Sequence, residues 1–191
     1  MTHGSGLALC PRRLPAGGAL RRGLRRALCA LGAGLSLGVQ ASELPEYRLK
    51  AAFIYNFIAF TEWPAATGPT LNLCIHGSDP FGSEIDALQG KPTNGRTIAL
   101  QRNVRVEGLR GCQVAFIAAS AQEHLPRVLD ALRGNPTLTV ADSPGAMRRG
   151  VALNMNIAAG KVSFEANVVA ARAASLTLSS KLLRLATEVE Q

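Results

Sequence analysis

The sequence predicts one α/β domain, with a central, mostly parallel sheet, helices on both faces, a late antiparallel β-hairpin and a C-terminal helix. Three observations indicate this fold class. Short apolar strands alternate with helical segments from residue 71 to residue 141, which implies parallel strands joined by right-handed crossovers. Residues 113–119 are almost continuously apolar, as in a strand that is covered on both faces. Beyond residue 150 the apolar period becomes two on either side of a glycine turn, which is typical of a hairpin.

The first predicted element is a helix from Pro45 to Phe60. Proline suits the first turn, apolar residues recur at spacings of four, and Trp63-Pro64 cannot continue the helix. Arg48 and Lys50 mark the side of the helix that we expect to face water. The apolar stripe is expected to consist of Leu49, Phe53, Ile54, Phe57 and Ile58.

The next elements are predicted to form the first half of the sheet. Residues 71–76 are a strand, and Asp79 then suits the N-cap of a helix that ends at Gly90. Asn94-Gly95 is a turn before a strand over residues 97–101. The buried face of the intervening helix is expected to consist of Phe81, Ile85 and Leu88.

The second half of the sheet follows the apolar strand over residues 113–119. The next helix begins either at a capping box formed by Ser120 and Glu123 or at Pro126, and residues 137–141 are a short strand.

The last third of the chain has a different pattern. Residues 151–157 and 162–166 alternate apolar and polar side chains around a glycine turn. This pattern predicts a hairpin with one face exposed to solvent. Residues 168–186 are predicted to form one helix with a broad apolar stripe and many small residues.

The basic charge of the chain is concentrated at its N-terminus. The 191 residues include 21 Lys and Arg against 13 Asp and Glu, and 47% hydrophobic residues are enough to bury a core. Six arginines and no acidic residue lie in residues 1–41, which leaves 15 basic and 13 acidic residues for the rest. This nearly neutral remainder predicts no nucleic-acid partner.

Residues 1–41 have the layout of a secretory signal peptide. A basic stretch is followed by an uncharged apolar run over residues 27–39, and small side chains at Val39 and Ala41 then suit a signal peptidase. We therefore expect export to the periplasm, cleavage near Ala41 and a mature domain over residues 42–191. Because the apolar run is short for a membrane span, cleavage is favoured over anchoring, and an uncleaved inner-membrane anchor is the alternative.

Four cysteines divide between this leader and the domain. Cys10 and Cys29 leave with the signal peptide, whereas Cys74 and Cys112 remain in an oxidising compartment, where disulfides persist. Two cysteines in an exported domain predict one bridge, and two buried free thiols are the alternative. The bridge can form if the strands next to the two cysteines are neighbours.

No sequence motif of an enzyme, a nucleotide site or a metal site occurs in the chain, so we predict no catalytic residue, no cofactor and no metal ligand. His76 and Ser78 lie at the carboxyl end of the first predicted strand, where open α/β sheets bind ligands. The alternative is an ordinary strand-end histidine beside a turn. Trp63 is either a core side chain or a partner contact, and Arg148 and Arg149 are either solvated or in contact with an acidic partner.

Six segments of the chain resemble a known family when they are taken in order. They are Lys50–Phe57 with Glu62-Trp63-Pro64, Leu73–Gly77, Gly111–Ile117, Leu138–Asp142, Val162–Asn167 and Ser179–Ala186. Together they resemble the YfiR-type periplasmic regulators over about residues 46–187.

The resemblance implies a non-enzymatic periplasmic regulator in cyclic-di-GMP signalling. The best-known members bind the periplasmic part of an inner-membrane diguanylate cyclase and hold it inactive, and an outer-membrane lipoprotein releases them. The resemblance also implies a disulfide between Cys74 and Cys112. The predicted partners are therefore an inner-membrane sensor or cyclase and an outer-membrane lipoprotein, and a homodimer is also considered.

Two other functions stay open at this point. One is a periplasmic sensory module that binds a small ligand in a pocket near His76. The other is a hydrolase that uses His76 and Ser78.

Overall fold

The elements of the fold are described for residues 46–158 and 160–191 of this computed structural model, and the predicted signal peptide over residues 1–41 lies outside the described residues. In chain order the helices and strands are α1 (Glu46–Ala59), β1 (Thr61–Glu62), β2 (Thr70–His76), the 3₁₀ helix η1 (Gly82–Leu88), β3 (Pro92–Thr93), β4 (Arg96–Gln101), the 3₁₀ helix η2 (Val106–Gly111), β5 (Val114–Ile117), the 3₁₀ helix η3 (Ala119–His124), α2 (Leu125–Leu132), β6 (Leu138–Ala141), the 3₁₀ helix η4 (Met147–Arg149), β7 (Leu153–Ala158), β8 (Lys161–Asn167), α3 (Val168–Ala173), β9 (Thr177–Leu178), α4 (Ser180–Leu183) and β10 (Glu188–Glu190).

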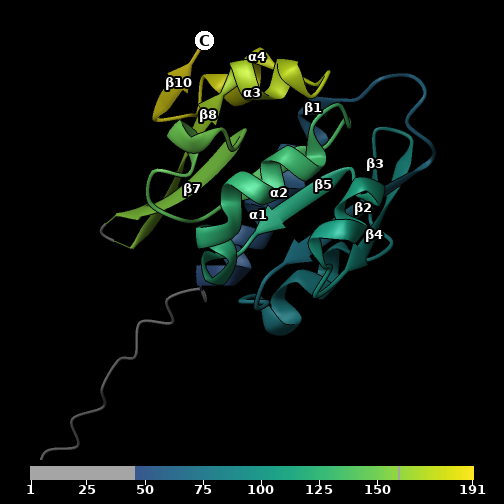
Figure 1. The fold of residues 1–191 in the computed structure, drawn as a ribbon, viewed down its shortest axis with the longest axis horizontal. Coiled ribbons are helices and arrows are strands. Elements are labelled where there is room, and N and C mark those ends of the chain that lie inside the picture. Colours follow the sequence, from purple (N-terminus) through teal and green to yellow (C-terminus); the bar gives the residue numbers. More distant parts are fainter. Residues whose placement is uncertain (1–45, 159) are drawn as a thin grey trace, which may run out of the picture. The chain divides into compact units, whose positions relative to one another are not determined.

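A mixed sheet of eight strands forms the centre of the fold, in the order β10-β8-β7-β6-β5-β2-β4-β3 (Figure 1). From β4 through β2, β5 and β6 to β7, neighbouring strands run parallel, and β7 and β8 pair antiparallel as the predicted hairpin. β1 and β9 form a separate antiparallel pair. The predicted fold class is therefore confirmed.

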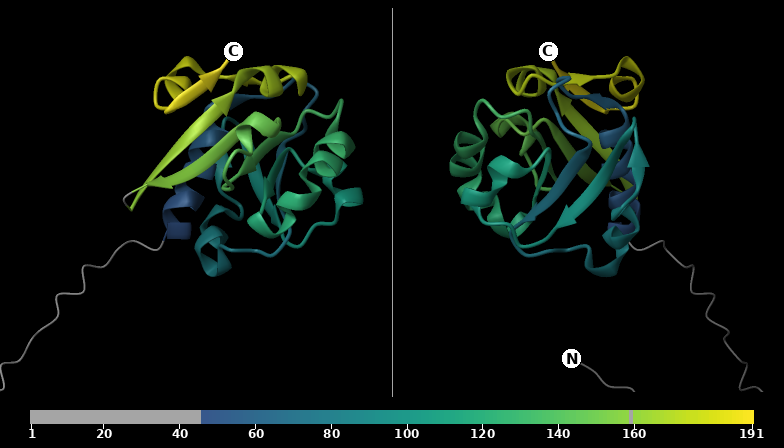
Figure 2. Two further views of the ribbon diagram at one scale, coloured as in Figure 1. Left: turned by 60° about the vertical axis from the view of Figure 1, so that its left-hand side comes forward. Right: turned by 90° about the vertical axis from the view of Figure 1, so that its right-hand side faces the viewer.

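Alternate residues of the central strands point to opposite faces of the sheet, and helices cover both faces. In β2, Leu73 and Ile75 join the core that includes α1, whereas Cys74 joins the core that includes α2 and η2. The right-hand view of Figure 2 shows α1 and α2 on opposite sides of the sheet. β5 is buried along its whole length, as its apolar run predicts.

A disulfide joins Cys74 of β2 to Cys112, which lies just before the neighbouring strand β5. The two Cα atoms are 5.9 Å apart, a separation that is usual for a bridge. The two residues are 0% and 2% exposed. The bridge that the sequence predicts is therefore present, and it joins positions that are 38 residues apart.

The C-terminal segment is not the single helix that the sequence predicts over residues 168–186. α3 is short, and Ser175 has a positive φ of 58°, which a helix does not allow. Leu176 and Leu178 are both buried, and a spacing of two brings both side chains to one side only where the backbone is extended. β9 therefore pairs with β1, and Ser179 caps the separate helix α4.

One predicted helix start differs from the structure, and the structure decides between the two alternatives for another. η1 is a 3₁₀ helix, and Asp79 caps the turn before it, where its Oδ1 accepts a hydrogen bond from the Phe81 N–H over 2.8 Å. The capping box of Ser120 and Glu123 is not formed, because Ser120 Oγ accepts a hydrogen bond from the Ser78 N–H over 2.8 Å. A contact with another loop has replaced the local cap. The alternative start at Pro126 is confirmed, because α2 begins at Leu125 and has this proline in its first turn.

Replacing both bridge cysteines with alanine should lower the free energy of unfolding by about 3–4 kcal/mol, because the bridge restricts a long loop of the unfolded chain. Urea denaturation of the protein with its bridge formed measures this loss. Reduction of the wild-type protein should lower its stability similarly, and reduction of the Cys74→Ala/Cys112→Ala variant should change nothing further. Equal stability of the oxidised wild type and the variant would contradict this prediction.

Candidate functional site

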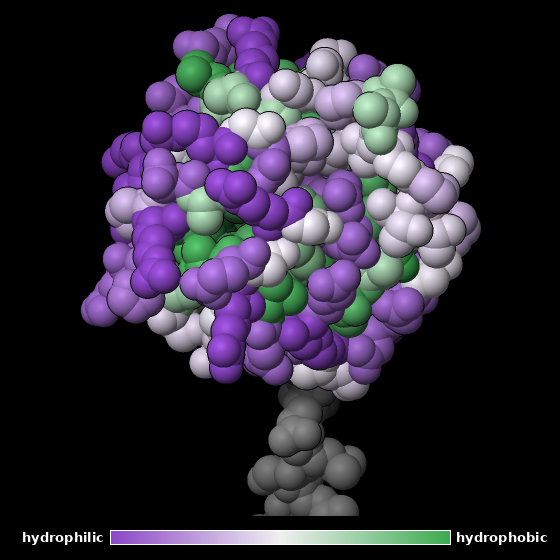
Figure 3. Space-filling view, turned by 45° about the vertical axis from the view of Figure 1, so that its right-hand side comes forward, coloured by the Kyte–Doolittle hydropathy of each residue, from purple (hydrophilic) through white to green (hydrophobic). Residues whose placement is uncertain are grey.

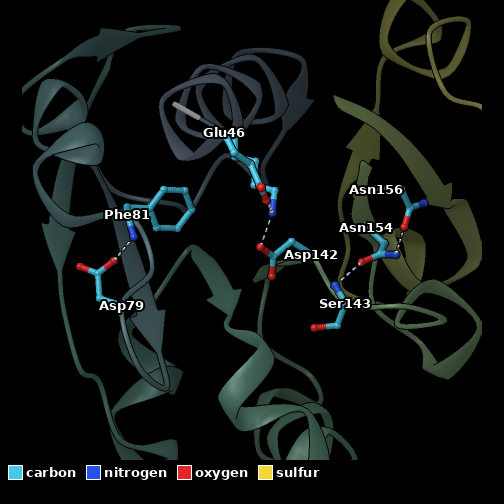
Figure 4. A network of polar contacts seen from close by, with 8 residues as sticks. Glu46, Asp79, Phe81, Asp142, Ser143, Asn154 and Asn156 are labelled. Carbon is cyan, nitrogen blue, oxygen red and sulfur yellow. Dashed lines mark hydrogen bonds and ion pairs between the residues drawn. The ribbon is translucent and has the colours of Figure 1, made fainter. Parts of the chain in front are cut away.

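The carboxyl ends of the parallel strands meet the start of α1 at one edge of the sheet, where open α/β sheets usually bind ligands. Two buried charges meet there. Lys50 Nζ in α1 donates a hydrogen bond of 2.6 Å to Oδ2 of Asp142, the residue directly after β6 (Figure 4). The two side chains are only 5% and 3% exposed. Glu46, one turn earlier on α1, is a second partner of Lys50.

The burial of Lys50 shows that its predicted position on the water-facing side of the helix was wrong. Lys50 is followed by Ile54 and Ile58 at intervals of four, so it belongs to the buried stripe of α1. Arg48 is exposed, as predicted. Sequence reasoning missed this pair, although the four-residue spacing was a signal for Lys50. Nothing local pointed to Asp142, which lies 92 residues away along the chain.

The partners of Lys50 keep its ammonium group charged. Burial by itself would lower the pKa of Lys50, but hydrogen bonds to Asp142 and Glu46 outweigh burial and raise the pKa above 10.5. Tyr47 lies beside the pair, and the Lys50 ammonium is 4.4 Å from the centre of its ring. Burial, and then the negative charge of Asp142, raise the pKa of Tyr47 above 10.0.

A set of amide contacts extends from the loop after β6 to the hairpin (Figure 4). The Ser143 N–H donates to Asn154 Oδ1 over 3.2 Å, and Asn154 Nδ2 donates to Asn156 over 3.3 Å and to Glu165 over 3.1 Å. Asn154 is fully buried, although it belongs to the predicted solvent-exposed face of the hairpin. Among the described residues, Asp142 Oδ1 and Ser143 Oγ are buried without a hydrogen-bond partner. The edge is thus held by hydrogen bonds among its own groups, while these two buried oxygen atoms stay unpaired.

The candidate residues His76 and Ser78 lie at the same edge, where local contacts engage them. His76 Nδ1 donates to the Val104 carbonyl oxygen over 2.8 Å, which ties the end of β2 to the loop after β4. The backbone of Ser78 is held by η3, as described above, and the neighbouring Asp79 pairs with Arg102. These contacts are typical of an ordinary strand end, and ligand binding by His76 or Ser78 stays a prediction.

The other candidate residues divide between the core and the surface. Trp63 is 9% exposed and belongs to the core that includes α1. Arg148 and Arg149 are exposed. Arg148 lies 3.7 Å from a carboxylate oxygen of Glu188, and Arg149 donates to the Gln122 carbonyl oxygen over 2.8 Å. A contact between any of these three and a partner stays a prediction.

Three described cavities lie away from His76 and Ser78. One of about 490 Å³ lies between α2 and α3, one of about 450 Å³ lies between α1 and η1, and one of about 360 Å³ lies beside the turn between β3 and β4. On the face drawn in Figure 3, hydrophobic residues show in hollows between hydrophilic ones. In the part of the chain that the structure describes, no group of three or more His, Cys, Asp or Glu side chains is placed to hold a metal ion.

A family profile described as YfiR/HmsC-like matches residues 47–187. The chain belongs to the YfiR/HmsC-like family. The resemblance drawn from six sequence segments is therefore confirmed. Membership supports a periplasmic regulator of cyclic-di-GMP signalling, and the family is a regulatory one. None of the helices within residues 46–158 and 160–191 has the length and apolar character needed to cross a membrane.

Solved structures resemble the YfiR/HmsC-like chain at low sequence identity. A conserved domain protein from Vibrio cholerae O1 biovar eltor str. N16961 has a TM-score of 0.54 at 8% identity, and the match covers 76% of this chain and 60% of that chain. The ABC domain in complex with L-Trp from Streptococcus pneumonia has a TM-score of 0.49 at 8% identity, over 75% and 60% of the two chains. The chain thus spans 60% of the length of both structures. The first likeness shows the fold alone, and the search of curated proteins finds no match.

Removing one member of the buried pair should destabilise the protein strongly, because the other charge is then buried with poorer compensation. Lys50→Met and Asp142→Leu should each cost about 3–5 kcal/mol of unfolding free energy, and the double variant should recover part of this loss. Arg48→Met, on the exposed side of the same helix, is the matched control and should change stability by less than about 0.5 kcal/mol. Urea denaturation measures all four variants, and additive losses in the double variant would contradict the pairing.

Alkaline pH should weaken the same edge. The folded-state pKa values of Lys50 and Tyr47 are raised, so the stability that they contribute is complete below about pH 10 and is lost as the pH rises through the folded values. Unfolding free energies measured from pH 9 upwards should therefore fall more steeply for the wild type than for the variant Lys50→Met/Tyr47→Phe. Parallel curves for the two proteins would rule out this linkage.

Proposed function

We propose that the chain is an exported regulator that binds the periplasmic part of an inner-membrane signalling protein of the diguanylate cyclase type and holds it inactive. The match to the YfiR/HmsC-like family over residues 47–187 is the observation that carries this proposal. Export depends on the leader over residues 1–41. An outer-membrane lipoprotein that binds the chain would release the cyclase.

The last part of the chain offers apolar side chains that a partner could cover. Among the described residues, the large hydrophobic side chains that are exposed are Ile157 at 43%, Val169 at 51% and Leu185 at 71%. Ile157 lies near the tip of the β7–β8 hairpin, Val169 lies in α3, and Leu185 lies just after α4. In Figures 1 and 2, α3 and α4 lie at the same end of the described domain as the C-terminus.

Basic side chains accompany two of these residues. Arg172 in α3 and Lys181 in α4 are exposed, and so is Arg184 directly after α4. Within the described part of the chain, none of the three takes part in an ion pair. We define the C-terminal surface as Val169, Arg172, Lys181, Arg184 and Leu185. Its mixture of apolar and positive groups favours an acidic partner segment with an apolar side chain at its centre.

Binding at this surface would regulate a cyclase through differential affinity. A regulator shifts an equilibrium between active and inactive conformations only if it binds one of them more tightly. The chain would bind the inactive conformation of the periplasmic part better, and its removal by the lipoprotein would return the population to the active conformation. No chemical step on the regulator is needed.

The variant Leu185→Glu tests the proposal, because it places a charge among the apolar groups and repels an acidic partner. Loss of an interface anchor should weaken binding about ten-fold or more. In the native host, deletion of the coding sequence should raise cyclic-di-GMP, and the wild type should lower it again. Leu185→Glu should fail to do so, whereas Ile157→Glu on the hairpin is the matched control and should succeed.

Immunoblots of the periplasmic fraction ensure that both variants are present at wild-type levels. Unchanged cyclic-di-GMP on deletion would overturn the proposed function. Full repression by Leu185→Glu, together with loss of repression by Ile157→Glu, would move the interface from the C-terminal surface to the hairpin.

A further inference from the structure

The cavity of about 490 Å³ between α2 and α3 lies above β6, near the end of the strand opposite to Asp142. We propose that it binds a small carboxylic acid with an apolar chain. This inference goes beyond the proposed function, since it concerns a ligand rather than a protein partner. It rests on the walls, the floor and the mouth of the cavity.

The walls of the cavity are apolar. Leu129 and Leu132 of α2 form one wall, and Val169, Ala170 and Ala173 of α3 form the other. The alanines leave space between the helices where larger side chains would fill it. The volume falls in the range of about 300–1,000 Å³ that is usual for small-molecule sites, which also have mainly apolar walls. An aliphatic chain therefore matches the middle of the cavity.

The floor of the cavity has a spare hydrogen-bond donor. Thr137 Oγ1 donates a hydrogen bond of 2.7 Å to the Cys112 carbonyl oxygen, so the hydroxyl proton of Thr137 is not free for a ligand. Thr139 Oγ1 accepts a hydrogen bond from the Ala152 N–H over 2.9 Å, and no acceptor for its own proton is found among the described residues. Thr139 is only 7% exposed, and a hydroxyl group donates one hydrogen bond. The floor therefore favours a ligand that accepts hydrogen bonds.

Arg149 supplies further hydrogen-bond donors at the mouth of the cavity. Asp130 pairs with Arg133 at 3.1 Å, and Glu190 accepts a hydrogen bond from the uncharged amide of Asn167 over 2.7 Å. Arg149 uses one N–H group for the Gln122 carbonyl oxygen, and a guanidinium group has five such donors. Charges of both signs therefore lie at the mouth, and the unused N–H donors of Arg149 are the groups that can bind a carboxylate there.

Sodium octanoate is the probe, below its micelle concentration, with octan-1-ol and octylamine as ligands of the same chain length. Amide NMR spectra of the folded domain report both the site and the affinity. Octanoate should shift the signals of α2 and α3. Octan-1-ol and octylamine should bind at least about ten-fold more weakly, because each lacks the anionic head.

Two variants and a control locate the site. Ala173→Leu fills the cavity and should abolish the shifts, and Arg149→Gln should weaken octanoate about ten-fold while leaving octan-1-ol unaffected. Ala52→Leu is the matched control, since Ala52 is also an exposed helical alanine but lines the cavity between α1 and η1. It should leave octanoate binding unchanged.

The opposite results overturn the proposal. Absence of shifts at millimolar octanoate, or unchanged binding to Ala173→Leu, would show that the cavity is not the site. Equal affinity for octanoate and octan-1-ol would show that the carboxylate is not recognised. None of these outcomes depends on the cyclase partner, so the proposed function stands or falls separately.

Discussion

A buried contact between opposite charges joins the N-terminal part of α1 to the central sheet. Lys50 is fixed in the apolar stripe of the helix, and a charge there is tolerated only where a partner and hydrogen bonds replace water. Asp142 supplies the partner from the end of β6, and both side chains are almost completely buried. The contact joins the first helix to a strand in the middle of the sheet. It therefore adds a specific polar contact at the carboxyl edge to the apolar packing of Ile54, Phe57 and Ile58.

This edge has the usual location of an α/β ligand site, but most of its polar groups are used within the protein. His76 holds the loop after β4, Asp79 holds Arg102 and the turn before η1, and Asn154 holds the loop after β6. The surfaces that we propose for recognition lie elsewhere, on the apolar and basic C-terminal surface and in the cavity between α2 and α3. In this proposal the strand ends contribute stability, and the C-terminal elements contribute contacts with partners.

Local patterns in the sequence predicted the elements whose burial repeats along the chain. The continuous apolar run of β5, the alternation of β7 and β8, and the cysteines beside neighbouring strands all gave the correct arrangement. Contacts across long sequence separations were not predictable in this way. Lys50 was placed toward water because its partner is distant. Ser120 was one of two predicted helix starts, and its hydrogen bond to the loop after β2 leaves the start at Pro126. The prediction of one C-terminal helix over residues 168–186 was wrong, because Leu176 and Leu178 are both buried and require an extended backbone between them.

The charge state of Lys50 is the most direct measure of the contact on which this account depends. An NMR titration that follows the Lys50 side-chain carbon next to the ammonium group reports its pKa in the folded protein. Lys50 is expected to stay charged and to have a pKa above the ordinary lysine value of 10.5. A pKa of Lys50 below that ordinary value would mean that burial outweighs its partners and would contradict the paired, charged state.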